Sequence, residues 1–363
     1  MAKAALTPRE RVVRNLARQE ADRPAFSWSF GPQPPARAAL DAHLAAWGLD
    51  YPRLYDATCD VRSFSAAYVG PGLPPRTSPW GWTTRAVSYG AGAYDEFDHL
   101  PLARAESVAD VERHPWPDAR HFDAEGVGQD MRQDDPNHRY ARVLWGGNPL
   151  EILMWIMGLE KVLVGLVAEP AMIDAALERI TSIFEAILRR SLEGAAGEAD
   201  AVYIADDVGT QNGPMMSPAT YRARVKPYHA RLCRVAHEHG LPAIHHSDGS
   251  VAGLLYDLID AGVDCLEAVQ TECRDMAPES LKARFGTRLA FQGGVSVQQV
   301  LPRGTEADVR RHVRHLKATL GRGGGYICAP SHAIQAGTPP ENVVAMVEEG
   351  VEKTLAEIAH GKA

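Results

Sequence analysis

Hydrophobic and polar positions follow different periods in different parts of the chain, and these periods predict the elements. Apolar side chains recur at helical spacing over residues 8–20 and again over 36–48, which predicts two N-terminal helices. The intervening segment PAFSWSF, residues 24–30, predicts a short strand, and a second strand candidate lies near residues 53–60. The N-terminal part therefore combines helices with two short strands.

The pattern changes over residues 68–118, which are rich in Gly, Pro and aromatic residues. The run PWGWTTRAVSYGAGAYDEF within this segment is typical of a β-hairpin. We expect the segment to be a hairpin-rich insertion that caps the main body as a lid.

After Arg139, short apolar strands alternate with long helices. Asn148-Pro149, Ser217-Pro218 and a T-x-x-E capping box over residues 338–341 with Pro at the first helical position predict helix starts, and Pro227 predicts a kink. Strands are predicted at residues 141–146, 201–207, 242–249, 263–269, 288–294 and 324–330.

Six such strands plus the two earlier ones approach eight, and strand–helix alternation predicts parallel pairing. We therefore expect an α/β fold, a (β/α)₈ TIM-type barrel with N-terminal helices, formed by residues 1–363 as one domain. A doubly wound sheet is the alternative, but no glycine fingerprint follows the first strand. The sequence also contains no G-x-x-x-x-G-K-[ST] phosphate-binding motif.

Composition excludes several classes of function. Lys and Arg number 38 against 46 Asp and Glu, a net charge of −8, which argues against nucleic-acid binding and a polybasic membrane surface. The longest apolar run, Ile152–Leu159, is far shorter than the roughly 20 residues of a membrane span. Five scattered cysteines without a CxxC pair, and an N-terminus unlike a secretory signal, predict a cytoplasmic protein without disulfides. The oligomeric state stays open, a homodimer included.

Polar side chains follow five consecutive predicted strands. In a barrel the ends of the strands and the loops after them form one rim, where active sites lie, so these side chains should converge. They are Asp206, Asp207, His245, His246, Asp248, Glu267, Gln270, Gln292 and His332.

Three of these residues form the sharpest constellation. His246 and Asp248 are two positions apart on an extended segment and share a side, so both can reach one ion together with His332. Two imidazoles and a carboxylate suit zinc, iron or manganese and leave a position open for substrate. The alternative is a metal-free hydrogen-bonded cluster. Asp206 or Asp207 would add a fourth ligand, a general base or a substrate contact, unless they lie in a solvated loop or at a helix terminus.

At these strand ends the sequence resembles the uroporphyrinogen decarboxylase superfamily, which holds the heme-pathway decarboxylase and the zinc methyltransferases that serve corrinoid proteins. The resemblance covers nearly the whole chain, from ERVVRNLARQEADRP through PLARAESVADVERHPWP to PSHAIQAGTPPENV. It implies a (β/α)₈ barrel with the active residues in the C-terminal cleft.

The decarboxylase branch carries an R-Q-A-G-R stretch after its first strand, whose cations clamp a substrate with eight carboxylates. This chain has SWSFGPQPPAR there, with only Arg37 and Arg62 nearby. Asp60 matches the pyrrole-binding aspartate of that branch. Together with the strand-end residues, the resemblance marks a set of candidate substrate-binding residues: Asp60, Arg62, Glu267, Gln270 and Gln292.

The methyltransferase branch carries H-x-C-G and a later cysteine that together hold zinc. Here the matching positions are His246, Asp248 and His332, so the resemblance implies a zinc site with altered ligands. A His/Asp/His site carries less negative charge than a His/Cys/Cys site. It should act as a stronger Lewis acid and prefer oxygen or nitrogen donors over a coenzyme thiol.

These observations predict a metal-assisted methyltransferase, a demethylase of a small O- or N-methyl donor, with Asp206, Asp207 and His332 as candidate catalytic residues. The acceptor would be a corrinoid on a partner protein or tetrahydrofolate, since the D-x-H-x-x-G corrinoid signature is absent from the chain. The alternative is a metal-free decarboxylase of a smaller carboxylic acid that uses His332 and Asp60. A barrel that binds a ligand without catalysis is a third reading.

Overall fold

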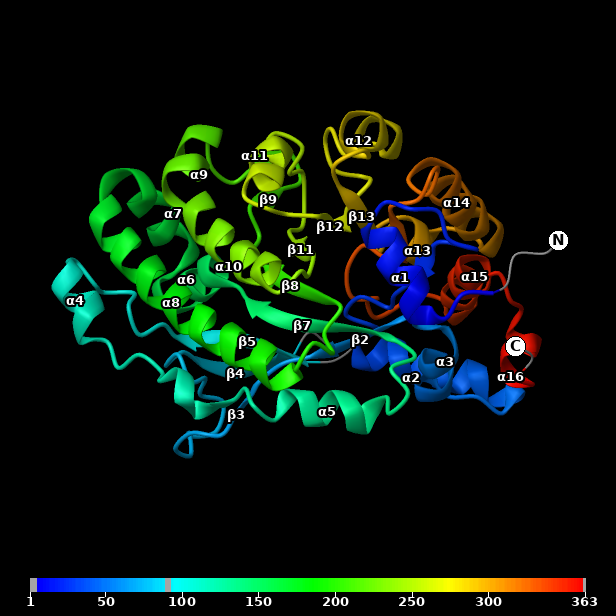
Figure 1. The fold of residues 1–363 in the computed structure, drawn as a ribbon, viewed down its shortest axis with the longest axis horizontal. Coiled ribbons are helices and arrows are strands. Elements are labelled where there is room, and N and C mark those ends of the chain that lie inside the picture. Colours follow the sequence, from blue (N-terminus) through cyan, green and yellow to red (C-terminus); the bar gives the residue numbers. More distant parts are fainter. Residues whose placement is uncertain (1–4, 89–92, 362–363) are drawn as a thin grey trace.

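The computed structural model describes residues 5–88 and 93–361, and its centre is a barrel of eight parallel strands (Figure 1). Neighbouring strands follow the order β1-β14-β13-β12-β11-β8-β7-β2. Their bounds are Ala25–Phe26 (β1), Val61–Phe64 (β2), Ala141–Gly147 (β7), Ala201–Ala205 (β8), Ala243–His246 (β11), Cys265–Val269 (β12), Ala290–Val295 (β13) and Tyr326–Pro330 (β14). The prediction of a TIM-type α/β barrel is confirmed.

The seam between β1 and β2 is closed by one residue instead of a strand ladder. The backbone N–H of Asp60 donates to the carbonyl of Phe26 at 2.8 Å, and the Asp60 carboxylate accepts from the Phe26 N–H at 2.7 Å. Arg11 and Arg23 donate to the same carboxylate at 2.8 and 2.9 Å. Because Asp60 precedes β2, this closure lies at the N-terminal end of the barrel strands.

Helices surround the barrel because its strands are buried along nearly their whole length and must be covered by apolar helix faces. The helices before the second half of the chain are α1 (Pro8–Leu16), α2 (Pro34–Leu44), α3 (Tyr51–Thr58), α4 (Val108–Arg113), α5 (Val127–Asp134), α6 (Pro149–Met157), α7 (Leu159–Ala168) and α8 (Pro170–Ala195). Those that follow are α9 (Pro218–Arg224), α10 (Lys226–Glu238), α11 (Leu255–Asp260), α12 (Pro278–Phe285), α13 (Val300–Arg303), α14 (Glu306–Thr319), α15 (Pro340–Val351) and α16 (Leu355–Ala359).

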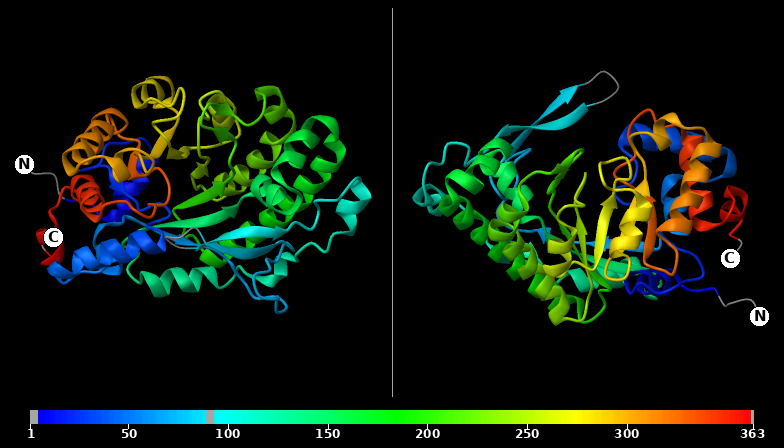
Figure 2. Two further views of the ribbon diagram at one scale, coloured as in Figure 1. Left: turned by 180° about the vertical axis from the view of Figure 1, so that it is seen from behind. Right: turned by 90° about the horizontal axis from the view of Figure 1, so that it is seen from above.

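The predicted insertion is a hairpin with flanking segments. Strands β4 (Thr83–Ser88) and β5 (Ala93–His99) pair antiparallel, and the hairpin projects from the body (Figure 2). Strand β3 (Ala67–Tyr68) pairs with β6 (Phe122–Asp123) at the base of the insertion. Residues 89–92, at the tip of the predicted hairpin, lie outside the described residues.

Three sequence predictions differ from the structure. The strand expected near residues 53–60 is helix α3, because Asp50 caps it and the strand begins only at Val61. The break between α9 and α10 falls at Val225, so Pro227 starts a new helix instead of kinking one. The prediction of a capping box that begins at Thr338 is wrong. Pro339 is the N-cap of α15, and the Thr338 hydroxyl is buried without a partner among the described residues.

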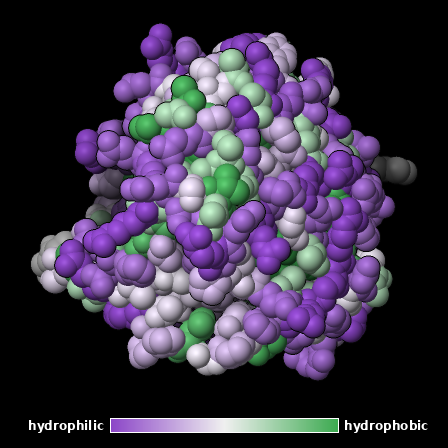
Figure 3. Space-filling model, turned by 90° about the vertical axis from the view of Figure 1, so that its left-hand side faces the viewer, coloured by the Kyte–Doolittle hydropathy of each residue, from purple (hydrophilic) through white to green (hydrophobic). Residues whose placement is uncertain are grey.

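The helices, one side of the surface and the cysteines can be compared with what the composition predicts. Within the described residues, no helix combines the length and apolar character needed to cross a bilayer. The side of the molecule that carries α4 and α7 is mostly hydrophilic, with small separate hydrophobic patches (Figure 3). All five cysteines are buried and unpaired, as the scattered spacing predicts.

Candidate metal centre

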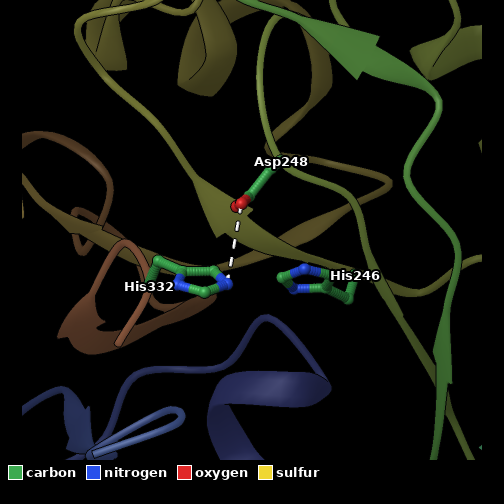
Figure 4. A group of neighbouring side chains, drawn as sticks. All are labelled: His246, Asp248 and His332. Carbon is green, nitrogen blue, oxygen red and sulfur yellow. Dashed lines mark ion pairs between the residues drawn. The ribbon is translucent and has the colours of Figure 1, made fainter. Parts of the chain in front are cut away.

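His246, Asp248 and His332 converge at the C-terminal end of the barrel strands (Figure 4). His246 is the last residue of β11, Asp248 follows two positions later, and His332 lies in the loop after β14. One ligand atom from each residue lies within 4.8 Å of the other two, and His332 Nε2 is 3.7 Å from Asp248 Oδ2. The structure thus brings together the three residues that the sequence proposes as metal ligands.

A buried carboxylate orients the first of these histidines. His246 Nδ1 lies 2.5 Å from Glu267 Oε2, which leaves Nε2 facing Asp248 and His332. The three residues His246, Asp248 and His332 are called the cluster below. Burial opposes a charge on His246, but the Glu267 carboxylate outweighs it and raises the pKa of His246 to about 9. A carboxylate that holds the second nitrogen of a ligating histidine is a common arrangement around protein-bound metals, because it fixes the tautomer and raises the basicity of the ligand.

The Asp248 carboxylate has the environment expected of a metal ligand. Its Oδ1 atom is buried and finds no hydrogen-bond donor among the described residues. Burial raises the pKa of Asp248 to about 6. A buried carboxylate oxygen without a donor is costly unless a cation compensates it. The donor set therefore fits a divalent metal, and two imidazoles with one carboxylate suit zinc.

The two consecutive aspartates after β8 have different roles. Asp207 Oδ1 accepts the backbone N–H of Asp248 at 2.6 Å and lies 3.8 Å from His246 Nε2, so Asp207 faces the cluster. Asp206 is fully buried and accepts the N–H groups of Leu150 and Glu151 at the start of α6, at 2.9 and 2.8 Å. Asp206 also pairs with His229 at 2.9 Å, so both of its oxygens are engaged away from the cluster.

The candidate substrate-binding residues divide into two groups. Glu267 and Gln292 line a cavity inside the barrel, and Gln270 accepts the backbone N–H of Gly249 at 2.5 Å and so holds the loop that carries Asp248. Asp60 closes the opposite end of the barrel. Arg62 points out of β2, where it pairs with Asp56 and stacks over Tyr140. The structure does not bring Asp60 and Arg62 to the cluster.

The cavity has a volume of about 490 Å³ and lies beside the cluster. Its lining is mainly apolar and aromatic, with a few hydroxyl and amide groups. Phe30 connects the cavity to the cluster, since its ring centroid is 5.2 Å from that of His246 and 4.8 Å from that of His332. Trp80, from the predicted lid segment, closes part of the cavity wall.

Several residues of the site were not found by sequence reasoning. The Tyr203 hydroxyl and the Ser29 hydroxyl both donate to Glu267, and Phe30 packs on both histidines. Burial, reinforced by Asp206, raises the pKa of Glu151 at the start of α6 to about 7. Because side chains alternate between the two faces of a strand, the sequence could have placed Tyr203 on the inward face of β8. The contacts of Ser29 and Phe30 depend on how the loop after β1 folds.

Comparison with known proteins agrees with this architecture. The sequence model of the family "Uroporphyrinogen decarboxylase (URO-D)" matches residues 145–352. A uroporphyrinogen decarboxylase of Thermus thermophilus is 32% identical over 182 residues, which cover 50% of this chain and 48% of that protein. One from Nocardia farcinica is 30% identical over 192 residues, 52% of this chain and 51% of that protein. The chain thus spans about half the length of the curated relatives it matches.

A solved structure described as a methyltransferase from Methanosarcina mazei superposes with a TM-score of 0.66 at 17% identity. The superposition covers 96% of this chain and 99% of that one, so the two share the same fold over their whole length.

Proposed function

This chain belongs to the uroporphyrinogen decarboxylase family, and within that family we propose that it is a metal-assisted methyltransferase. It would move a methyl group from a small O- or N-methyl donor to a corrinoid on a partner protein or to tetrahydrofolate. The observation that carries the proposal is the convergence of His246, Asp248 and His332, with an Asp248 oxygen that is buried and lacks a donor among the described residues. A cytoplasmic location belongs to the same proposal.

The chain's own residues have defined parts in this reaction. His246, Asp248 and His332 would hold the metal, and Glu267 orients His246. A bound divalent metal, zinc first among the candidates, supplies Lewis acidity that weakens the bond between the methyl carbon and the heteroatom. That bond breaks with its electron pair left on the heteroatom, and the acceptor supplies the pair for the new bond to carbon. Asp207, which faces the cluster, positions or protonates the leaving heteroatom.

Decarboxylation of a small acid is the second candidate, because the curated relatives are named uroporphyrinogen decarboxylases. The lining of the cavity argues against it. None of the described residues that line the cavity is Lys, Arg or His, so a buried substrate carboxylate would lack a cationic partner. The same reason argues against uroporphyrinogen itself as the substrate.

Elemental analysis of protein purified without chelators tests the proposal. The wild-type chain should carry close to one divalent metal, and His246→Ala and His332→Ala should lose most of it. His312→Ala is the matched control, because His312 Nε2 contacts the carbonyl of Gly294 and the residue is not part of the cluster. Wild-type protein that is metal-free and cannot be reconstituted with zinc, iron or manganese would refute the site and move the decarboxylase forward.

A further inference from the structure

The shape and lining of the cavity indicate which chemical class of methyl donor would bind, which the group of His246, Asp248 and His332 does not. Its wall includes aromatic rings contributed by the loop after β1, by β2, β7 and β8, and by the insertion: Phe30, Phe64, Trp145, Tyr203 and Trp80. Trp145 stacks on Tyr203 with ring centroids 5.7 Å apart and an angle of 29° between the planes. Flat apolar walls of this kind favour a flat apolar ligand through dispersion and ring stacking.

A close approach of two elements extends this wall. Gly147 has a φ of +122°, and a Cβ built there would lie 2.5 Å from Phe184 Cγ on α8. Because β7 carries no side chain at this point, Phe184 approaches the strand and its ring becomes part of the cavity lining. The ring centroids of Phe184 and Trp80 are 5.2 Å apart. The volume of about 490 Å³ is in the range of about 300–1,000 Å³ that proteins use for small organic ligands.

The charges on the cavity wall argue against an ionic ligand. Glu267 is the only charged side chain among the described lining residues, and it already accepts from Tyr203, Ser29 and His246. An acidic ligand would find no cation in this wall, and burial of an unpaired charge is costly. A quaternary ammonium would have no lone pair for a metal, and a protonated amine would place its charge beside the dication.

The remaining polar groups of the cavity are neutral. Ser27, Ser63, Ser65, Asn148 and Gln292 lie around the apolar wall and offer hydroxyl and amide groups. Such groups form hydrogen bonds to the uncharged oxygens of a substituted ring and fix its orientation. Ser29 and Phe30 lie where the cavity meets the cluster, so one end of a ring held in the cavity faces the metal site.

We infer that the methyl donor is a neutral aromatic methyl ether, with its ring in the barrel cavity and its methoxy oxygen toward His246, Asp248 and His332. This inference rests on the proposed function and narrows its donor class. In the reaction the methyl–oxygen bond breaks, the electron pair stays on the aryl oxygen, and the product is the corresponding phenol after protonation. The nucleophile of the acceptor, a reduced corrinoid or the amine of tetrahydrofolate, supplies the electron pair for the new bond.

Equilibrium binding of a matched ligand series tests the donor class without requiring turnover. The series keeps one ring and changes its charge: 4-methoxyphenol, 4-methoxybenzoate and (4-methoxyphenyl)trimethylammonium. Dissociation constants come from isothermal titration calorimetry and from quenching of tryptophan fluorescence, with zinc-free and zinc-loaded protein. The neutral ether should bind both forms at least about tenfold more tightly than either ion. Equal or tighter binding of an ion, or no binding of the neutral ether, would overturn the inference.

Variants at Ser63 locate the ligand. Ser63 lies on the cavity side of β2 and is exposed, so Ser63→Trp fills the cavity with little burial of new polar groups, whereas Ser63→Ala leaves it open. Ser63→Trp should weaken binding of 4-methoxyphenol at least about tenfold, and Ser63→Ala by less than about threefold. Ser65→Trp replaces the first variant if far-UV circular dichroism shows that it does not fold. Unchanged binding in the folded tryptophan variant would overturn the location.

The two proposals fail in different ways in these experiments. If the protein binds the neutral ether but holds no metal, methyl transfer assisted by a metal is wrong, while the ligand class of the cavity stands. If it holds the metal but prefers an ionic ligand, the metal site stands and the aromatic ether is wrong. Release of the phenol, measured by chromatography with a reduced corrinoid as acceptor, then tests both together.

Discussion

At the scale of single residues, Glu267 connects the cavity to the group formed by His246, Asp248 and His332. It is fully buried and accepts hydrogen bonds from three elements, through Ser29, Tyr203 and His246. Burial opposes its ionisation, but the imidazole of His246 lowers the pKa of Glu267 overall. The residue therefore supplies a negative charge that orients His246 without itself belonging to the proposed ligands.

Replacement of this carboxylate should weaken metal binding without removing a ligand. Glu267→Gln keeps the size of the side chain but removes the charge that fixes the His246 tautomer, and loss of such a partner typically costs about 10–100-fold in affinity. Competition with a chromogenic chelator measures the zinc dissociation constant. Glu272→Gln, which replaces a carboxylate bonded to Ser296, is the control and should change affinity by less than about threefold. Equal affinities of the Glu267 variant and the wild type would contradict the orienting role.

Glu151 predicts a pH dependence of stability. Burial raises its pKa from 4.5 to about 7, so the folded state holds this proton more tightly than the unfolded state does. Ionisation of Glu151 contributes nothing to the free energy of unfolding below pH 4.5. It lowers that free energy as the pH rises toward 7, and the loss is constant above that pH. Glu151→Gln should therefore raise the free energy of unfolding by on the order of 3 kcal/mol at pH 8 and by almost nothing at pH 4.

Urea denaturation of the metal-free protein at both pH values measures this difference. Glu160→Gln is the control, because Glu160 lies in the first turn of α7 and is exposed. A gain that is the same at pH 4 and pH 8 would show that the charge of Glu151 is not its cause.

At the scale of elements, the start of α6 depends on a side chain from another strand. Asn148 occupies the N-cap position, but its side chain makes no cap hydrogen bond and donates instead to Glu151. The free N–H groups of Leu150 and Glu151 are satisfied by Asp206, at the end of β8. A charged acceptor at a helix N-terminus is favoured by the unpaired N–H groups and the helix dipole.

Asp206→Asn should therefore lower stability and leave the metal site in place. The side-chain amide has one acceptor oxygen in place of two, so it cannot accept from the two N–H groups and bond His229 Nε2 at once, and a buried polar group left unsatisfied costs about 1–3 kcal/mol. Asp174→Asn breaks the partly exposed pair with Arg224 and should cost less than about 1 kcal/mol. Urea denaturation gives the free energies, and zinc content should be unchanged in both. A stable Asp206 variant with lost metal would contradict this assignment.

At the scale of the whole molecule, Asp60 makes the hydrogen bonds that close the barrel between β1 and β2. The two strands at the seam are short, and the Asp60 carboxylate joins Phe26 of β1 to Arg11 of α1 and to Arg23. Asp60 and both arginine side chains are largely buried, so these ion pairs are shielded from solvent. The geometry makes this aspartate a structural link between the N-terminal helix and the sheet.

Asp60→Ala should loosen the seam and destabilise the whole barrel. It leaves two largely buried guanidinium groups without this partner, and breaking a buried pair costs about 3–5 kcal/mol. Hydrogen exchange should accelerate first at the amides of β1 and β2. Asp56→Ala removes an exposed partner of Arg62 and should change stability by less than about 0.5 kcal/mol. Protected seam amides in the Asp60 variant would show that the seam is closed by packing instead.

The sequence by itself determined the features that depend on local spacing. Strand and helix positions after residue 139 follow from short apolar runs separated by long amphipathic segments, and α8 (Pro170–Ala195) is one of the long helices expected between the strands. The pairing of His246 with Asp248 follows from the two-residue period of an extended chain. The convergence with His332 follows from barrel geometry, because all strand ends of a closed parallel barrel share one rim.

Tertiary structure decided what local spacing cannot specify. Asp206 and Asp207 are neighbours of the same type, and only packing against α6 turns one to a helix start and leaves the other at the cluster. Asp60 carries the same carboxylate as the rim residues but precedes its strand, so barrel closure places it at the opposite end. The aromatic cavity, in which Glu267 is the single charged side chain among the described lining residues, is formed by side chains of several strands, a helix and the insertion. Their proximity depends on long-range packing, for which the period of a single segment provides no signal.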